Sequence, residues 1–168
     1  SPPCTSSAAS DVYKRQGYQA LVANTTGTNN VAVGSNALDA NTTAQHNVAV
    51  GKGALSTVTT GGFNTAIGGD ALAANTTAAG STAVGFAALD ANTTADFSTG
   101  VGFNALSSNT TGASNTAVGA YSLEACTTSP YNVAVGMNSL KALTTGSTVG
   151  ENTAVGHNAL ALNTTGYR

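Results

Sequence analysis

Few residues of this 168-residue chain carry side chains that could do chemistry. His46 and His157 stand in variable positions with no recurring partner, whereas a metal or catalytic site needs convergent groups, so we expect both to face solvent. Cys126 stands where most copies of a repeated triplet have asparagine, which predicts a small buried side chain and not a nucleophile. Asp39 and Asp90 hold equivalent but not neighbouring positions, which favours solvated turns over a calcium site. These residues predict no catalytic, metal or cofactor site.

The triplet Asn-Thr-Thr is formally an acceptor for N-linked glycosylation. It begins at Asn24, Asn41, Asn75, Asn92, Asn109 and Asn163. Val58, Cys126 and Leu143 replace the asparagine in other copies, and apolar residues would hardly replace a glycan-bearing surface residue. We therefore expect these asparagines to form a ladder in the interior or at its edge, and glycosylation stays the less favoured alternative.

The triplet belongs to a longer repeated unit, Asn-x-Ala-Val-Gly-x-x-Ala-Leu-x-x-Asn-Thr-Thr-Gly-x-x. Its first glycine recurs at one fixed spacing of seventeen positions, at Gly17, Gly34, Gly51, Gly68, Gly85, Gly102, Gly119 and Gly136, and Gly156 follows after a longer step. A short fixed period indicates one small structural unit stacked on copies of itself. The additional residues of the longer step fall within residues 146–151, where we expect a bulged loop at a turn.

The short period points to a scaffold or binding surface and not to a catalytic pocket, and the composition favours regular order over disorder. Charged residues make up 7% of the chain, far below the roughly 25% of an average soluble domain. The net charge of -2 gives no footprint for nucleic acid. No apolar run approaches the ~20 residues that span a bilayer, so we expect no membrane contact in this part of the protein.

Residues 1–16 share nothing with the repeat. The stretch from Ser6 to Gln16 resembles the translation of a sequencing adaptor, which predicts a non-native, disordered leader before a repeat domain over residues 17–168. A natural disordered leader is the alternative. The chain stops where another copy should begin, which predicts a fragment of a longer array.

Each copy predicts one short strand, such as Val31-Ala32-Val33, because β-branched residues favour strands. Alternation places the valines on one face and the alanine on the other, and we expect the valines inside with leucine. The alanine and glycine face would then lie against a close neighbour. Corners after the strand and after Thr-Thr predict a flattened coil with two extended legs, and a helical turn in the Ala-Leu leg is the alternative.

Stacked coils place like residues above one another, about 4.8 Å apart. The sequence thus predicts an all-β fold, a parallel β-solenoid of about nine coils with one repeat in each. Its apolar spine is thin, with about two large side chains per coil, so we expect copies to associate through the Ala-Gly face. The predicted structural ladders are Leu38, Leu55, Leu72, Leu89, Leu106 and Leu123, with Val33, Val50, Ile67, Val84, Val101 and Val118.

The recurring Asn-x-Ala-Val-Gly strand, with glycine corners and few charges, resembles the head repeats of trimeric autotransporter adhesins, the YadA-like head. Similar Asn-Thr-Ala-Val-Gly and Asn-Thr-Thr-Gly arrays occur in phage tail-fibre-like proteins. The resemblance covers residues 17–168, although the adhesin repeat is shorter and lacks the Ala-Leu and Asn-Thr-Thr insertion. It implies a left-handed roll, a homotrimer, and an extracellular location on a cell surface or virion. It also implies binding to a host-cell surface, matrix or glycan receptor.

An ice-binding solenoid is the alternative function, because stacked threonines on a flat face could order water. Adjacent threonines of an extended leg point to opposite faces, which would leave one column per leg. A repeat-built hydrolase or lyase is least favoured, since such enzymes cluster acids and bases on one face. The threonine column considered for surface binding is Thr25, Thr42, Thr59, Thr76, Thr93 and Thr110.

Overall fold

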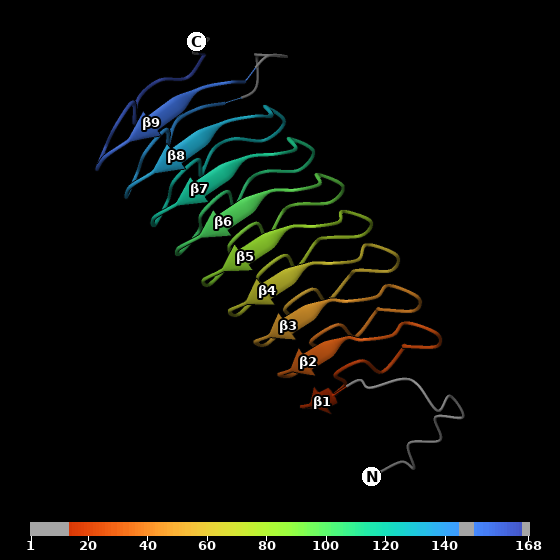
Figure 1. Cartoon of the computed structure of the whole chain (residues 1–168). Helices are drawn as coiled ribbons and strands as arrows, with labels where there is room; N and C mark the ends of the chain where they lie inside the picture. The colour runs from red at the N-terminus through yellow and green to blue at the C-terminus, as the bar shows by residue number, and fades with distance from the viewer. Residues whose placement is uncertain (1–13, 145–149, 166–168) are drawn as a thin grey trace.

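The computed structural model describes residues 14–144 and 150–165 as a stack of similar coils (Figure 1). Each coil contributes one strand of three residues, and the nine strands form a single parallel sheet in sequence order. No helix occurs within the described ranges. The predicted all-β solenoid is therefore confirmed. The strands are β1 (Lys14–Gln16), β2 (Val31–Val33), β3 (Val48–Val50), β4 (Thr65–Ile67), β5 (Thr82–Val84), β6 (Thr99–Val101), β7 (Thr116–Val118), β8 (Val133–Val135) and β9 (Thr153–Val155).

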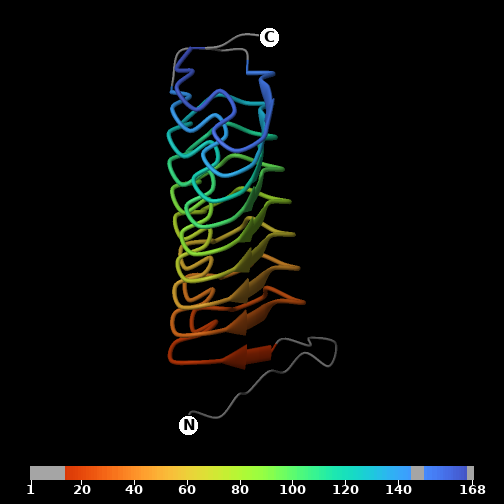
Figure 2. The same cartoon turned by 90° about the vertical axis from the view of Figure 1, so that its left-hand side faces the viewer.

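Like residues stack on like residues along the whole sheet. Val33 pairs with Val50, and Val50 pairs with Ile67, so the register follows the sequence period. Seen from the side, the strands rise as one straight column with the turns beside them (Figure 2). Within the described residues, most buried apolar side chains form one continuous cluster along the axis, and no separate globular core lies beside it.

The longer last repeat keeps the register of its neighbours. Val133 of β8 pairs with Thr153 of β9, which lies further along the chain than the regular period would place it. Thr144 donates its backbone N–H to the carbonyl of Thr164 at 3.2 Å, with the same longer offset. The insertion therefore lies between Thr144 and Asn152, and the predicted bulge falls largely on residues 145–149, outside the described residues.

The first strand lies inside the segment that the sequence assigned to a leader. Gln16 precedes Gly17 as Val33 precedes Gly34, and the two residues pair in register. Parallel pairing uses backbone groups, so it places few demands on side chains. The predicted disordered leader covered residues 1–16. For Lys14–Gln16 the prediction was wrong, because these residues form β1, and residues 1–13 lie outside the described residues.

The strand faces are reversed relative to the prediction. Ala32 is fully buried, whereas Val33 is 36% exposed, so alanine and not valine points into the coil. The interior is already occupied by leucine from the opposite side: a Cβ added at Gly100, an alanine position, would lie 3.2 Å from Cγ of Leu89. A small side chain is therefore required on the inner face, and the prediction that valine packs inside was wrong. The same burial excludes the Ala-Gly face from contact with another copy.

The Ala-Leu leg is neither a second extended leg nor a helix. It consists of turns, and Leu38 takes the left-handed conformation with φ 53°. The backbone N–H of Leu38 donates to the carbonyl of Ala54 in the next coil at 3.1 Å, so stacking satisfies this unusual backbone. Leu38 is fully buried. The predicted interior position of leucine is confirmed, and the predicted second extended leg was wrong.

The glycine after each strand is required by both conformation and space. Gly34 has φ 133°, a region that L-residues rarely adopt. A Cβ at Gly34 would lie 2.5 Å from the carbonyl oxygen of Gly51 in the next coil. The corner glycines therefore permit the close stacking of successive coils.

Candidate interaction surfaces

The outward face of the sheet is apolar and uncharged from β2 to β9. Its second column consists of valine and isoleucine, and Ile67 and Val118 are 41% and 37% exposed. Its first column consists of three valines and five threonines, with Val133 36% exposed. Contiguous exposed apolar surface of this kind marks an interaction site. The members are Val31, Val48, Thr65, Thr82, Thr99, Thr116, Val133 and Thr153 in the first column, and Val33, Val50, Ile67, Val84, Val101, Val118, Val135 and Val155 in the second.

Both threonines of each Asn-Thr-Thr triplet lie on the outside of the coil. Thr42 is partly exposed and Thr43 is exposed, because the segment is a bend and not an extended strand. The expectation that adjacent threonines point to opposite faces was therefore wrong. Two threonine columns run side by side along the rod.

The two threonine columns differ in their hydrogen bonds. In the first column the hydroxyl donates to the carbonyl of the equivalent residue one coil on, as from Thr25 to Thr42 at 2.9 Å and from Thr110 to Thr127 at 3.0 Å. Backbone N–H groups of Thr25 and Thr26 converge on the same Thr42 oxygen, at 3.0 and 3.1 Å. The first column is therefore part of the structural ladder. The second column is more exposed, and its Thr43 hydroxyl makes a longer bond to the carbonyl of Thr59, at 3.5 Å.

Aromatic rings form a stack at the corner that follows the strands. Phe86 and Phe103 are stacked with centroids 5.6 Å apart, and Tyr121 meets Phe103 edge-on at 5.4 Å. Nζ of Lys141 lies 4.8 Å from the centroid of the Tyr121 ring and 3.3 Å from a carboxylate oxygen of Glu124. Neighbouring groups occupy the ring faces along this stack, so we interpret it as a packing feature of the corner.

A different arrangement occupies the corner that precedes the strands. Phe63, Phe97 and Tyr131 are 68%, 67% and 60% exposed and occupy the same position in every second coil. The coils between them have Gly80 and Ser114 at this position. Sequence reasoning missed this row, although the regular spacing of two repeats between its members was present in the sequence.

The candidate reactive residues do not come together. His46 is exposed, with Nε2 3.1 Å from Nδ2 of Asn29, and His157 is exposed in a distant coil. Burial raises the pKa of the Cys126 thiol to about 11, and its Sγ donates to the carbonyl of Ser129 at 3.5 Å. Within residues 14–144 and 150–165, no group of three or more metal-ligating side chains lies together.

The equivalent acids Asp39 and Asp90 have different surroundings. An oxygen of Asp39 accepts from Nδ2 of Asn36 at 3.1 Å. Oδ1 of Asp90 is buried without a hydrogen-bond partner. Burial raises the pKa of this carboxyl, backbone hydrogen bonds from Ala91 and Asp90 oppose the rise in part, and Asp70 adds a smaller rise. Neither acid forms part of a metal-binding group.

The asparagines of the Asn-Thr-Thr triplets lie in the interior. Asn41, Asn75, Asn92 and Asn109 are fully buried, and only Asn24 and Asn163 near the ends of the described stack are partly exposed. A glycan cannot be accommodated at the four buried positions of the folded chain. The predicted interior position of this column is confirmed, although most of its side-chain hydrogen bonds lie within one turn.

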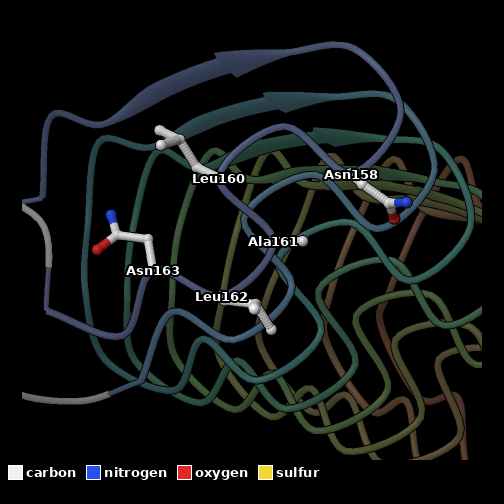
Figure 3. A pocket seen from close by; sticks show the side chains of 5 residues that line it. All are labelled: Asn158, Leu160, Ala161, Leu162 and Asn163. Atoms are coloured by element: carbon white, nitrogen blue, oxygen red, sulfur yellow. The ribbon is translucent and has the colours of Figure 1, made fainter.

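One hollow lies at the end of the last described coil (Figure 3). Leu160 is 53% exposed and Leu162 is 90% exposed there, whereas Leu140, one coil earlier, is fully buried. The hollow is thus the uncovered end of the leucine column and not a built ligand site. The residues that line it are Asn158, Leu160, Ala161, Leu162 and Asn163.

No protein-family model, curated protein or solved structure matches the chain. In the described part of the chain, no helix has the length and apolar character to cross a membrane.

Proposed function

We propose that this chain is a rigid structural and adhesive repeat segment of a surface adhesin or phage tail fibre, working outside the cell or on a virion. The observation that carries the proposal is the uncharged Val/Thr face, which runs unbroken from β2 to β9. Covering such a face with another surface is favourable, by about 25 cal/mol per Å² of apolar area removed from water. The molecule thus combines a rod-like scaffold with a built-in association surface.

A second copy is the natural cover for the Val/Thr face. Identical rods share the same coil spacing, so side chains of one copy can match those of another along the whole length. The resemblance to trimeric adhesins extends this proposal to a homotrimer with the Val/Thr faces towards the common axis. The corners and the threonine columns would then remain available to a host-cell surface, matrix or glycan receptor.

Light scattering of the purified chain tests the association. We expect three times the monomer mass for the wild type and the monomer mass for a Val84→Lys, Val101→Lys variant, because charges on the face oppose its burial. Thr94→Lys, on the exposed threonine column, is the matched control and should keep the wild-type mass. A monomeric wild type that also binds neither cells nor matrix would overturn the proposal.

An ice-binding function is the second candidate, and the two outward threonine columns favour it. Their coil-to-coil spacing of about 4.8 Å is close to the distance between next-nearest water oxygens in ice. Thermal hysteresis at micromolar protein is the test. Its loss in a Thr60→Lys, Thr77→Lys, Thr94→Lys variant would support this function, and no hysteresis in the wild type would exclude it.

A further inference from the structure

We propose that the row formed by Phe63, Phe97 and Tyr131 is a binding track for an extended β-1,4-linked polysaccharide, with one ring for each disaccharide. The inference rests on the proposed adhesive function and names its ligand class. It is carried by the exposure of the three rings, by their spacing and by the small residues between them.

The spacing of the row is set by the solenoid. Rings at this position in neighbouring coils, His46 and Phe63, have centroids 4.8 Å apart. Two coils therefore rise about 10 Å, which is also the length of one disaccharide in cellulose or chitin, where alternate sugars present the same face. A straight chain laid along the corner would place equivalent sugars over Phe63, Phe97 and Tyr131.

The chemistry of the row suits a neutral sugar chain. Aromatic rings bury the C–H faces of equatorially substituted pyranoses, a contact that adds hydrophobic burial to the attraction of the ring face. Polar groups lie beside the rings: Asp96 precedes Phe97, and its Oδ1 is fixed by accepting the N–H of Ala79 at 2.7 Å. The remaining carboxylate oxygen and the hydroxyl of Ser114 can bind sugar hydroxyls.

The gaps between the rings distinguish this row from the other aromatic corner. A Cβ built on Gly80 would lie 2.7 Å from the Phe97 ring, so the glycine leaves the space that this ring occupies. No aromatic residue stands between Phe97 and Tyr131, because Ser114 has that position. At the opposite corner, rings in successive coils stack on one another, as Phe86 and Phe103 do at 5.6 Å. In this row His46 stacks on Phe63, whereas Phe97 and Tyr131 have Gly80 and Ser114 as their neighbours on that side.

Adsorption to microcrystalline cellulose and to chitin beads tests the proposal, with amylose, an α-linked and curved chain, as the comparison. We expect the wild-type chain to bind cellulose or chitin and not to bind amylose. Phe97→Ala and Tyr131→Ala should each weaken binding on the order of tenfold, the ratio that corresponds to one lost ring contact. Phe103→Ala, which removes a ring of the other corner, is the matched control and should bind as the wild type does.

A Ser114→Phe variant tests the spacing itself. Phenylalanine is tolerated at this position, since Phe63 and Phe97 have φ 62° and 56° and Ser114 has φ 58°. The added ring should stack on its neighbours and reduce binding on the order of tenfold, although it adds apolar surface. Stronger binding by Ser114→Phe, no adsorption by the wild type, or equal losses in Phe97→Ala and Phe103→Ala would overturn the proposal. Molecular mass by light scattering, unchanged in these variants, reports separately on the association proposed above.

Discussion

Two columns of asparagine run through the interior of the rod, and they tolerate replacement very differently. We call them the Asn30 column and the Asn41 column. The first accepts only serine as a substitute, whereas the second accepts valine, cysteine and leucine. The Asn30 column is Asn30, Asn47, Asn64, Ser81, Ser98, Asn115, Asn132 and Asn152. The Asn41 column is Asn24, Asn41, Val58, Asn75, Asn92, Asn109, Cys126, Leu143 and Asn163.

Each side chain of the Asn30 column bonds the backbone of the next coil. Oδ1 of Asn30 accepts the N–H of Asn47 at 2.9 Å, and its Nδ2 donates to the carbonyl of Ala44 at 2.7 Å. Serine makes the same two hydrogen bonds, and both are longer. Oγ of Ser81 accepts the N–H of Ser98 at 3.3 Å and donates to the carbonyl of Ala95 at 3.4 Å. The column therefore requires a polar side chain, because a buried N–H would otherwise have no acceptor.

The Asn41 column mainly bonds its own turn. Nδ2 of Asn92 donates to the carbonyl of Ala95 at 3.1 Å, within the same coil. Apolar replacements still have a cost, which falls on the asparagine one coil earlier. Oδ1 of Asn41 and Oδ1 of Asn109 have no hydrogen-bond partner, and each precedes a replaced position, Val58 or Cys126. Between Asn24 and Asn41, Nδ2 of Asn41 donates to Oδ1 of Asn24 at 2.9 Å. Oδ1 of Asn75 and Oδ1 of Asn92 instead accept the N–H of Ala78 and of Ala95 in their own turns, at 2.9 and 3.1 Å.

The comparison shows that a repeated polar residue can be essential or dispensable according to which backbone group depends on it. In the Asn30 column the dependent group is the buried N–H of another coil. In the Asn41 column the dependent groups often have a second partner, as when the carbonyl of Gly112 accepts from both Asn109 and Asn115, at 3.0 and 2.9 Å.

The largest expected effect is that of Asn47→Val. It removes the acceptor of the Asn64 N–H and the donor that bonds the Gly61 carbonyl at 2.9 Å, so two buried groups lose their partners. We expect a loss of about 2–4 kcal/mol in the free energy of unfolding, measured by urea denaturation. Asn109→Val is the matched control and should cost less than about 1 kcal/mol. Equal losses in the two variants would contradict the distinction between the columns.

A second prediction concerns the thiol in the Asn41 column. Burial raises the pKa of Cys126 from 9.0 to about 11, so the unfolded thiol ionises at lower pH than the folded one. The contribution of the protonated thiol to the free energy of unfolding is therefore fully present below pH 9. It is lost as the pH rises towards 11, and the loss is about 2 kcal/mol. Urea denaturation at a series of pH values, from below 9 up to about 11, should show this loss of stability. The loss should be smaller in Cys126→Ser. Both proteins carry Cys4→Ser, so that one thiol is observed.

Much of this architecture could be predicted from the sequence, because the period alone sets the register. Gly34, Gly51 and their equivalents marked the corners, and the regular leucine predicted a buried spine. The side of the strand that faces inwards could not be predicted from alternation. The choice of face depends on how far Leu89 and its equivalents extend across the coil. That distance depends on the left-handed backbone conformation of these leucines, which a leucine side chain does not predict.

The surfaces were predicted less well than the interior. Thr42 and Thr43 both lie outside the interior because the chain bends there. The sequence Asn-Thr-Thr is equally compatible with an extended strand, so the bend could not be predicted. The row from Phe63 to Tyr131 was readable as a two-repeat spacing, but the choice between packing and exposure depends on the corner geometry. Periodicity thus predicts which residues share a column, and packing decides which way the column points.

A third prediction restores the hydrogen bond that Cys126 interrupts. In Cys126→Asn the new Nδ2 can donate to Oδ1 of Asn109, as Asn41 donates to Asn24. The two side chains have similar volume, so we expect a gain of about 1 kcal/mol in the free energy of unfolding. The gain should disappear in the Asn109→Val background, where no acceptor remains, and a double-mutant cycle measures the coupling. A gain of the same size in that background would assign it to another cause.

The smallest expected effect concerns Asp90, whose Oδ1 is buried without a partner like those of the interrupted asparagine column. Burial, and to a smaller extent Asp70, raises the pKa of this carboxyl above its ordinary 3.8, so the folded state favours the protonated form. The stabilisation by protonation is present at low pH and is lost as the pH rises through the interval above 3.8. Asp90→Asn should therefore raise stability at neutral pH by about a few tenths of a kcal/mol and flatten the acid limb of thermal unfolding. Asp39→Asn is the matched control and should give no gain, because Asp39 already accepts a hydrogen bond from Asn36.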